Sequence, residues 1–188
     1  MLTIILKCGT IWTYIMITIE DFLTPDLLKL LEERKVLAEL NPMANLGWSN
    51  YAWPAMLKHN SGLIWCSPCS EIDNDVYNIL LDIDKKFQQC TVECNFNIWG
   101  PLSMLPFHND TGHAFAVTVY LNHSWNVEDG GLFIYKNEEE NNKLEVIVPK
   151  YNLAVLNNSK LLHHVTPVSP YAKEKRFTLQ VWGKYKSE

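Results

Sequence analysis

The chain has 188 residues, of which 47% are hydrophobic and 20% are charged, and its net charge is −5. This composition supplies enough apolar material for a packed core and excludes a disordered or fibrous chain. The length fits a single domain spanning residues 1–188, since no linker divides it. Excess acidic residues disfavour a phosphate backbone as partner, so we expect no nucleic acid ligand. Five cysteines are too few for a secreted disulfide framework, which favours a cytoplasmic location.

The segment 2–19 is mostly apolar, as a membrane span or an export signal would be, but Lys7 and four threonines interrupt it. Its Ile, Thr, Trp and Tyr content is typical of a β-strand, so we expect a strand and no membrane partner. Met16 could equally be the natural start of the protein, with the earlier residues an upstream extension.

Two helices are predicted in the first half of the chain. Thr24 and Pro25 are typical of a helix start, and leucines follow at helical spacing, which predicts a helix over 25–40. Apolar side chains three and four positions apart predict a second helix over 70–88. Between the two, prolines, a glycine and tryptophans without periodicity favour loops and short strands.

After residue 90 the pattern changes to short runs of β-branched and aromatic residues separated by Gly, Pro, Asn and Asp. These runs predict strands over 92–99, 114–121, 132–135, 144–148, 153–156 and 177–182. Helices followed by strands predict an α+β fold, in which N-terminal helices and strands over about 1–90 support an antiparallel sandwich or barrel over about 91–185. The acidic run 138–140 is expected at a solvated hairpin tip.

A candidate metal site begins at His108 and Asp110, which stand two residues apart. In an extended strand their side chains project from the same face, so both can bind one ion. His163, far downstream, can return beside them. Two histidines and one carboxylate leave the opposite positions of the ion open, as in non-haem Fe(II) oxygenases, and zinc accepts the same ligands. The alternative is a surface His108–Asp110 hydrogen bond and an unrelated His163.

From His108 onward the sequence resembles the prolyl 4-hydroxylase-like group of 2-oxoglutarate- and Fe(II)-dependent dioxygenases, closest to the hypoxia-type and microbial prolyl hydroxylases. The resemblance is carried by six motifs in order: His108-Asn-Asp110, Tyr120-Leu-Asn122, Trp125 with Asp129-Gly-Gly131-Leu, Pro149-Lys-Tyr-Asn-Leu153, His163-x-Val-x-Pro-Val168, and Arg176 with Trp182 six positions later. It covers about half of the chain. It implies a double-stranded β-helix, which is a distorted jelly roll and agrees with the strand-rich second half.

The resemblance implies Fe(II) bound by His108, Asp110 and His163, with 2-oxoglutarate as cosubstrate and ascorbate as a further candidate cofactor. The neighbouring histidines are distinguished by the motif, because Val165 and Pro167 follow His163 by two and four positions. His164 is then expected to face away from the metal, since adjacent strand residues point to opposite faces.

A cation is needed for the far carboxylate of 2-oxoglutarate, and the resemblance implies Arg176, whose planar fork can grip a carboxylate. Lys173 is a rival, since some relatives use lysine, but only Arg176 has a tryptophan six positions later, at Trp182. Tyr120 matches a tyrosine whose hydroxyl meets the same carboxylate. The alternative for Tyr120 is an ordinary core aromatic residue.

The implied reaction is a hydroxylation coupled to decarboxylation of 2-oxoglutarate to succinate. Related halogenases have a small residue in place of Asp110, so its carboxylate favours hydroxylation. Related nucleic-acid demethylases carry a second arginine where this chain has Trp182. The expected substrate is a prolyl residue in a peptide or protein, and a free amino acid or small metabolite stays open. No motif indicates the oligomeric state.

Competing signals come from the cysteines. Trp65-Cys66-Ser-Pro-Cys69 resembles the thioredoxin motif, and a following helix start would lower a thiol pKa. No βαβ unit surrounds it, which favours a buried or incidental pair. Together with Cys90 and Cys94 the spacing could hold structural zinc. A thiol redox protein and a non-catalytic β-sandwich binding module are therefore alternatives to the oxygenase.

The remaining aromatic residues give weaker signals. Some histidines have no partner at ligand spacing and are interpreted as ordinary polar residues: His59, His113 and His123. Three tryptophans before the metal motif are expected in the core, or else at the substrate entrance: Trp48, Trp53 and Trp99.

Overall fold

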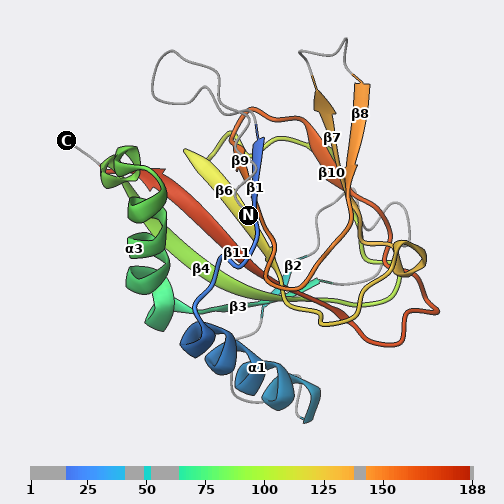
Figure 1. Ribbon diagram of the computed structural model, residues 1–188. Coiled ribbons are helices and arrows are strands. Elements are labelled where there is room, and N and C mark those ends of the chain that lie inside the picture. Colours follow the sequence, from blue (N-terminus) through green and yellow to red (C-terminus); the bar gives the residue numbers. More distant parts are fainter. Residues whose placement is uncertain (1–15, 41–48, 52–63, 138–142, 187–188) are drawn as a thin grey trace.

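The computed structural model describes residues 16–40, 49–51, 64–137 and 143–186, and it contains two antiparallel sheets (Figure 1). In spatial order the large sheet consists of β1 (Met16–Ile19), β9 (Ala154–Asn158), β6 (Phe115–Tyr120), β11 (Arg176–Tyr185), β4 (Cys90–Trp99), β3 (Ile64–Pro68) and β2 (Ser49–Tyr51). The small sheet consists of β5 (Leu105–His108), β10 (His163–Val165), β7 (Phe133–Asn137) and β8 (Lys143–Ile147). This is the predicted α+β fold with a double-stranded β-helix core.

The first predicted helix is confirmed at its predicted bounds as α1 (Pro25–Leu40), and the amide of Leu27 donates to Thr24 Oγ1 at 3.4 Å. The second predicted helix, over 70–88, is wrong in one respect: it is not a single continuous helix. Residues 70–89 form a 3-10 turn η1 (Ser70–Ile72), the helix α3 (Asp73–Ile83) and a second 3-10 turn η2 (Lys85–Gln89). Asp84 is extended, with φ −152°, and its carboxylate accepts from the amide of Lys86 at 2.9 Å. The side chain of Asp84 thus ends one helix and starts the next turn.

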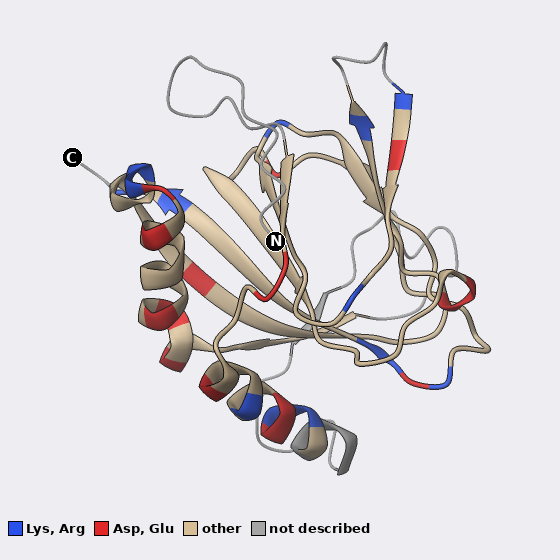
Figure 2. Cartoon of the chain, in the orientation of Figure 1, with Lys and Arg blue, Asp and Glu red and all other residues tan. Residues whose placement is uncertain are grey.

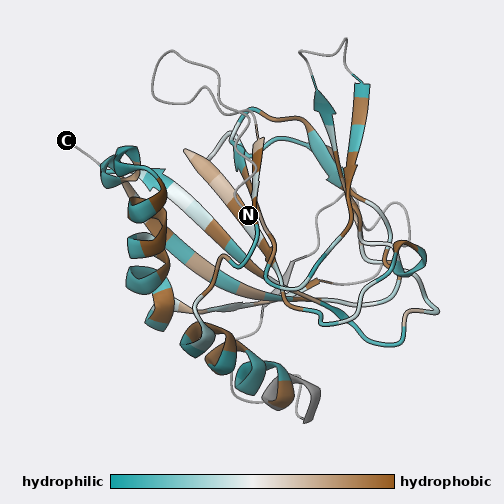
Figure 3. Cartoon of the chain, in the orientation of Figure 1, coloured by the Kyte–Doolittle hydropathy of each residue, from teal (hydrophilic) through white to brown (hydrophobic). Residues whose placement is uncertain are grey.

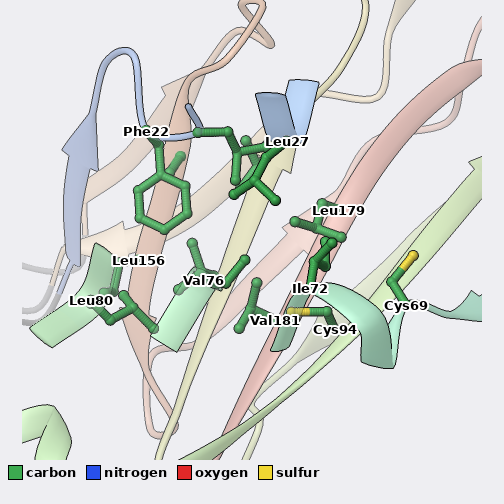
Figure 4. Packing of buried hydrophobic residues seen from close by; sticks show 14 of the residues in the cluster. Phe22, Leu27, Cys69, Ile72, Val76, Leu80, Cys94, Leu156, Leu179 and Val181 are labelled. Atoms are coloured by element: carbon green, nitrogen blue, oxygen red, sulfur yellow. The ribbon is translucent and has the colours of Figure 1, made fainter. Parts of the chain in front are cut away.

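The main core lies between the large sheet and the two helices. Along β11, Phe177, Leu179 and Val181 are completely buried on this side. Figure 4 shows Leu179 and Val181 close to Val76 of α3 and Leu27 of α1. Residues between these positions in β11 point to the opposite face, and Figure 3 shows the resulting alternation in hydropathy along the strand. The helices therefore pack on one face of the sheet, as predicted.

All six predicted strands are present, with shifts at their ends. The strands β3, β5 and β10 were not predicted; β5 and β10, with four and three residues, are too short for a clear alternation. No helix in the described segments is long and apolar enough to span a membrane. Several predictions lie outside the described residues: the strand before residue 16, the hairpin tip at 138–140, and the roles of Trp48, Trp53 and His59.

Candidate metal centre

The three predicted metal ligands meet between the two sheets. Strands β5 and β10 pair so that His163 lies opposite His108, and Asp110 follows β5 by two residues. The imidazole Nε2 atoms of His108 and His163 each lie 3.7 Å from a different carboxylate oxygen of Asp110. One ligand atom from each residue lies within 4.8 Å of the others, so the three side chains could hold one metal ion. This donor set is the facial triad of non-haem Fe(II) sites.

Hydrogen bonds behind the ligands orient all three. Nδ1 of His108 lies 2.7 Å from the carbonyl oxygen of Pro106, and Nδ1 of His163 lies 2.9 Å from that of Leu161. Because a carbonyl only accepts, each Nδ1 carries the proton and each Nε2 keeps a free lone pair for a metal. Asn157 Nδ2 donates to Asp110 Oδ2 at 3.2 Å. Burial lowers the pKa of His163, which favours the neutral, metal-binding imidazole.

His164 faces the other side of the small sheet. Its ring packs on Phe107, with 4.7 Å between ring centroids. It belongs to neither the triad nor the cavity beside it. The geometry thus groups His163, and not His164, with His108 and Asp110.

A cavity of about 330 Å³ extends from the triad between the sheets. Arg176 lies in its wall, at the start of β11. The other lining residues come mostly from strands of the large sheet, with a few from the small sheet: Ile64, Cys66, Asn95, Asn97, Trp99, Leu105, His113, Thr118, Phe133, Asn157, Val165, Gln180 and Trp182.

Arg176 is a fully buried cation without an anionic partner. None of its three guanidinium nitrogens makes a hydrogen bond. Elsewhere the charged residues lie along the helices, in loops and at several strand positions (Figure 2). The guanidinium stacks over the ring of Trp99 at 4.4 Å and lies 5.2 Å from that of Tyr120. Burial lowers the pKa of Arg176 to about 10, so the charge persists at neutral pH. A buried unpaired charge costs several kcal/mol, and a bound anion would remove that cost.

Tyr120 adds a second unused donor beside Arg176. Its hydroxyl is buried and has no hydrogen-bond partner. Burial raises the pKa of Tyr120, opposed by the charge of Arg176, so the hydroxyl stays protonated and can donate. The guanidinium and the phenol together suit a carboxylate, so the residues present fit the far end of 2-oxoglutarate.

The glycine turn before β7 makes room for this arginine. Gly131 has φ +62°, and a Cβ atom there would lie 2.6 Å from Cδ of Arg176. A Cβ atom on Gly130, which has φ +69°, would lie only 2.1 Å from the carbonyl oxygen of Pro167, and Trp125 Nε1 donates to the carbonyl of Gly130 at 2.8 Å. The two glycines of the motif Asp129-Gly-Gly131 thus let the backbone adopt positive φ and pass close to Pro167 and Arg176.

The rival cation, Lys173, is exposed and lies in a separate surface pocket beside Ser124 and Trp125. It does not line the cavity that holds the triad. The geometry therefore places Arg176, and not Lys173, within the cavity.

His113, which was interpreted from the sequence as an ordinary polar residue, is not part of the triad but does lie beside it. His113 lines the cavity and stacks on Trp182, with 4.3 Å between ring centroids, and its buried Nδ1 has no partner. The sequence also did not identify Asn97 and Gln180, which lie in the same wall. The available signal was polar residues at alternate positions in two otherwise apolar strands.

The cysteines do not support the competing functions. Cys66 lines the cavity, whereas Cys69 and Cys94 are buried in the main core (Figure 4). Burial raises the pKa of both Cys66 and Cys69 to about 11, which is opposite to the expected effect of a helix start. All four cysteines in the described segments are free, and the only group of metal ligands found there is the triad.

Comparisons with known proteins agree with this geometry. The family model described as the 2OG-Fe(II) oxygenase superfamily matches residues 94–184, and no curated protein sequence matches the chain. A prolyl-4-hydroxylase from Pseudomonas putida is 17% identical, with a TM-score of 0.72 over 93% of this chain and 95% of that chain. A prolyl hydroxylase from Trichoplax adhaerens, in complex with a peptide fragment of the hypoxia-inducible factor oxygen degradation domain, is 18% identical, with a TM-score of 0.68 over 92% and 84%. The alpha-ketoglutarate-dependent epimerase SnoN from nogalamycin biosynthesis is 10% identical, with a TM-score of 0.63 over 92% and 81%.

Proposed function

We propose that this chain, whose residues 94–184 match the 2OG-Fe(II) oxygenase superfamily, hydroxylates a prolyl residue in a peptide or protein. Fe(II) and 2-oxoglutarate are its cofactors. The observation that carries the proposal is a facial triad sharing one cavity with a buried, unpaired arginine. An ion and a dicarboxylate are the two ligands that these groups suit.

In this proposal His108, Asp110 and His163 hold Fe(II), and their backing hydrogen bonds keep the donor atoms aimed at it. Arg176 would bind the far carboxylate of 2-oxoglutarate, and the hydroxyl of Tyr120 would donate a hydrogen bond to the same group. Fe(II) and 2-oxoglutarate supply the oxidising chemistry when bound. One atom of dioxygen enters the substrate as hydroxyl, the other enters succinate, and carbon dioxide leaves.

The choice of a prolyl substrate is supported by the fold and by Asp110. Two structural neighbours are prolyl hydroxylases, and one of them is in complex with a peptide. The same fold also carries an epimerase, so the fold alone does not choose the reaction. Retention of the carboxylate at Asp110 favours hydroxylation over halogenation. A free amino acid or a small metabolite is the runner-up substrate.

The test is substrate-stimulated succinate release. The purified chain is supplied with Fe(II), 2-oxoglutarate and dioxygen, with and without ascorbate, and then with proline-containing peptides, matched peptides in which alanine replaces proline, free proline, or a single-stranded oligonucleotide. We expect a proline peptide to give the largest stimulation and to gain one oxygen atom in its mass. Greater stimulation by free proline or by the oligonucleotide would refute the prolyl-peptide proposal. Absence of succinate release under every condition would favour a non-catalytic binding module.

A further inference from the structure

The cavity wall contains polar groups beyond those that the metal and 2-oxoglutarate require. Asn95 and Asn97 on β4 and Gln180 on β11 all face the cavity. Gln180 lies opposite Asn95 where β11 pairs with β4, and opposite Thr118 where β11 pairs with β6. The polar residues thus form a row across three strands. Inner faces of packed sheets are normally apolar. Buried carboxamides in this position therefore call for an explanation.

Asn97 presents an unused acceptor. The residue is 7% exposed, and its Oδ1 atom is buried without a hydrogen-bond partner. Its neighbours in register are Thr178 and Cys66, and neither donates to it. A buried acceptor without a donor destabilises the fold, so the position is costly unless a ligand supplies the donor.

Gln180 presents the complementary donor. Thr118 Oγ1 donates to Gln180 Oε1 at 2.8 Å, which fixes the orientation of the carboxamide. The bond from Thr118 uses the carboxamide oxygen, so the amide nitrogen Nε2 is the donor end of this cavity-lining side chain. Since Gln180 and Asn97 lie on neighbouring strands as diagonal neighbours, their backbones are roughly 7–8 Å apart. One acceptor and one donor thus face the same part of the cavity.

Gln180 is separate from the cosubstrate cation, whereas Asn97, opposite Thr178, lies diagonally between Arg176 and Gln180. Gln180 lies four residues beyond Arg176 along β11, a distance of about 13 Å in an extended strand. Trp182 lies two residues farther along the same face and stacks on His113. The five-carbon 2-oxoglutarate would occupy the region between Arg176 and the triad, so Gln180 lies in the part of the cavity left for substrate and Asn97 lies at the border of that part.

We propose that Asn97 and Gln180 form a subsite for a peptide group of the substrate. Asn97 Oδ1 accepts a hydrogen bond from a backbone N–H, and Gln180 Nε2 donates to a backbone carbonyl, next to the residue that is oxidised. A peptide group offers one donor and one acceptor, which matches this pair. Neither side chain carries a positive charge that would attract a free carboxylate. The acceptor oxygen of Asn97 would also repel one, so a carboxylate is disfavoured here. The inference rests on the proposed function, because it names what surrounds the reacting residue.

A stability comparison tests Asn97 without any substrate. Asn122 is a matched control, because its carboxamide is buried and fully used: Nδ2 donates to the carbonyl of Lys175 at 2.8 Å, and Oδ1 accepts from the amide of Phe177 at 2.7 Å. We expect Asn122→Leu to lower the melting temperature by about 5 °C or more. Asn97→Leu should leave it unchanged or raise it. A comparable fall for Asn97→Leu would show that Asn97 supports the fold and would overturn the subsite.

A second experiment tests recognition with the proline peptide that best stimulates succinate release. Its backbone N–H groups on either side of the proline are methylated one at a time. We expect one methylation to lower kcat/KM about tenfold with the native chain and less than about twofold with Asn97→Leu. The KM for 2-oxoglutarate should not change. Equal sensitivity of both proteins at every position would overturn the subsite. If no proline peptide stimulates turnover, the proposed substrate has failed, and the melting comparison still decides the role of Asn97.

Discussion

The two faces of the large sheet differ in what they contribute. On the face covered by α1 and α3, β11 places Leu179 and Val181 in a dry core, whereas on the cavity face the same strand places Arg176 and Gln180. The first set stabilises the fold by burial, and the second holds polar groups that are left unpaired or paired only in part. Unpaired groups cost stability and are retained where function needs them. The residues on one face can therefore change with the chemistry while those on the other face keep the fold. This agrees with the fact that two hydroxylases and an epimerase share this architecture with the chain although they are only 10% to 18% identical to it.

The largest expected effect is on the cavity face, at the metal. Asp110→Ala removes the only carboxylate of the triad, so stimulated succinate release should fall more than about 100-fold, beyond the 10- to 100-fold typical of outer-shell changes. Asn157→Ala, which removes the hydrogen bond to Asp110, should fall within that smaller range. Both are measured as initial rates at saturating 2-oxoglutarate. Native turnover by Asp110→Ala would show that the metal ligands are assigned wrongly.

The next effect concerns the cosubstrate charge. Arg176→Ala removes a charge-assisted bidentate contact, so 2-oxoglutarate should bind about 2–5 kcal/mol more weakly while Fe(II) binding stays nearly intact. Lys173→Ala is the matched control, since its side chain is exposed in another pocket. The measurement is the KM for 2-oxoglutarate together with Fe(II) affinity. A larger effect at Lys173 would move the cosubstrate site out of the cavity.

On the helix-covered face the effect should appear in stability. Leu179→Ala leaves a cavity in a fully buried position, which should lower the free energy of unfolding by about 3 kcal/mol in urea denaturation. Thr91→Ala, at an exposed position of β4, should change it by less than about 0.5 kcal/mol. The KM for 2-oxoglutarate should be the same for both variants. If Leu179→Ala changed that KM more than it changed stability, the two faces would not act separately.

The smallest expected effect concerns Cys66, which lines the cavity. Because burial raises its pKa to about 11, the reactive thiolate becomes abundant only as the pH approaches 11. Alkylation of Cys66 by iodoacetamide at pH 7.5 should therefore be about 100-fold slower in the folded chain than in urea, and should accelerate as the pH rises. Mass spectrometry of the labelled peptides measures both rates. Rapid labelling near neutral pH, or a reversible Cys66–Cys69 disulfide, would restore the thiol redox alternative.

The elements that could be predicted depend on local signals. Thr24, Pro25 and leucines at helical spacing lie within one segment, and α1 has the predicted bounds. The long strands show alternation over enough residues to be recognised. The helix over 70–88 was predicted as continuous because apolar spacing does not show that Asp84 adopts an extended backbone. The place of His113 in the cavity wall could not be predicted for a related reason: the ring on which it stacks, Trp182, is distant in sequence.

By itself the sequence determined the fold class, the triad and the choice between His163 and His164, because residue type, spacing and alternation are properties of short segments. Only the tertiary structure decided that Arg176 is buried without a counter-ion, that Asn97 and Gln180 face the same cavity, and that the pKa of Cys66 is raised. Strand register brings together groups that are far apart in the chain, and burial between the sheets removes those groups from water. Burial sets the cost of a charge or an unpaired acceptor, and no local pattern encodes burial.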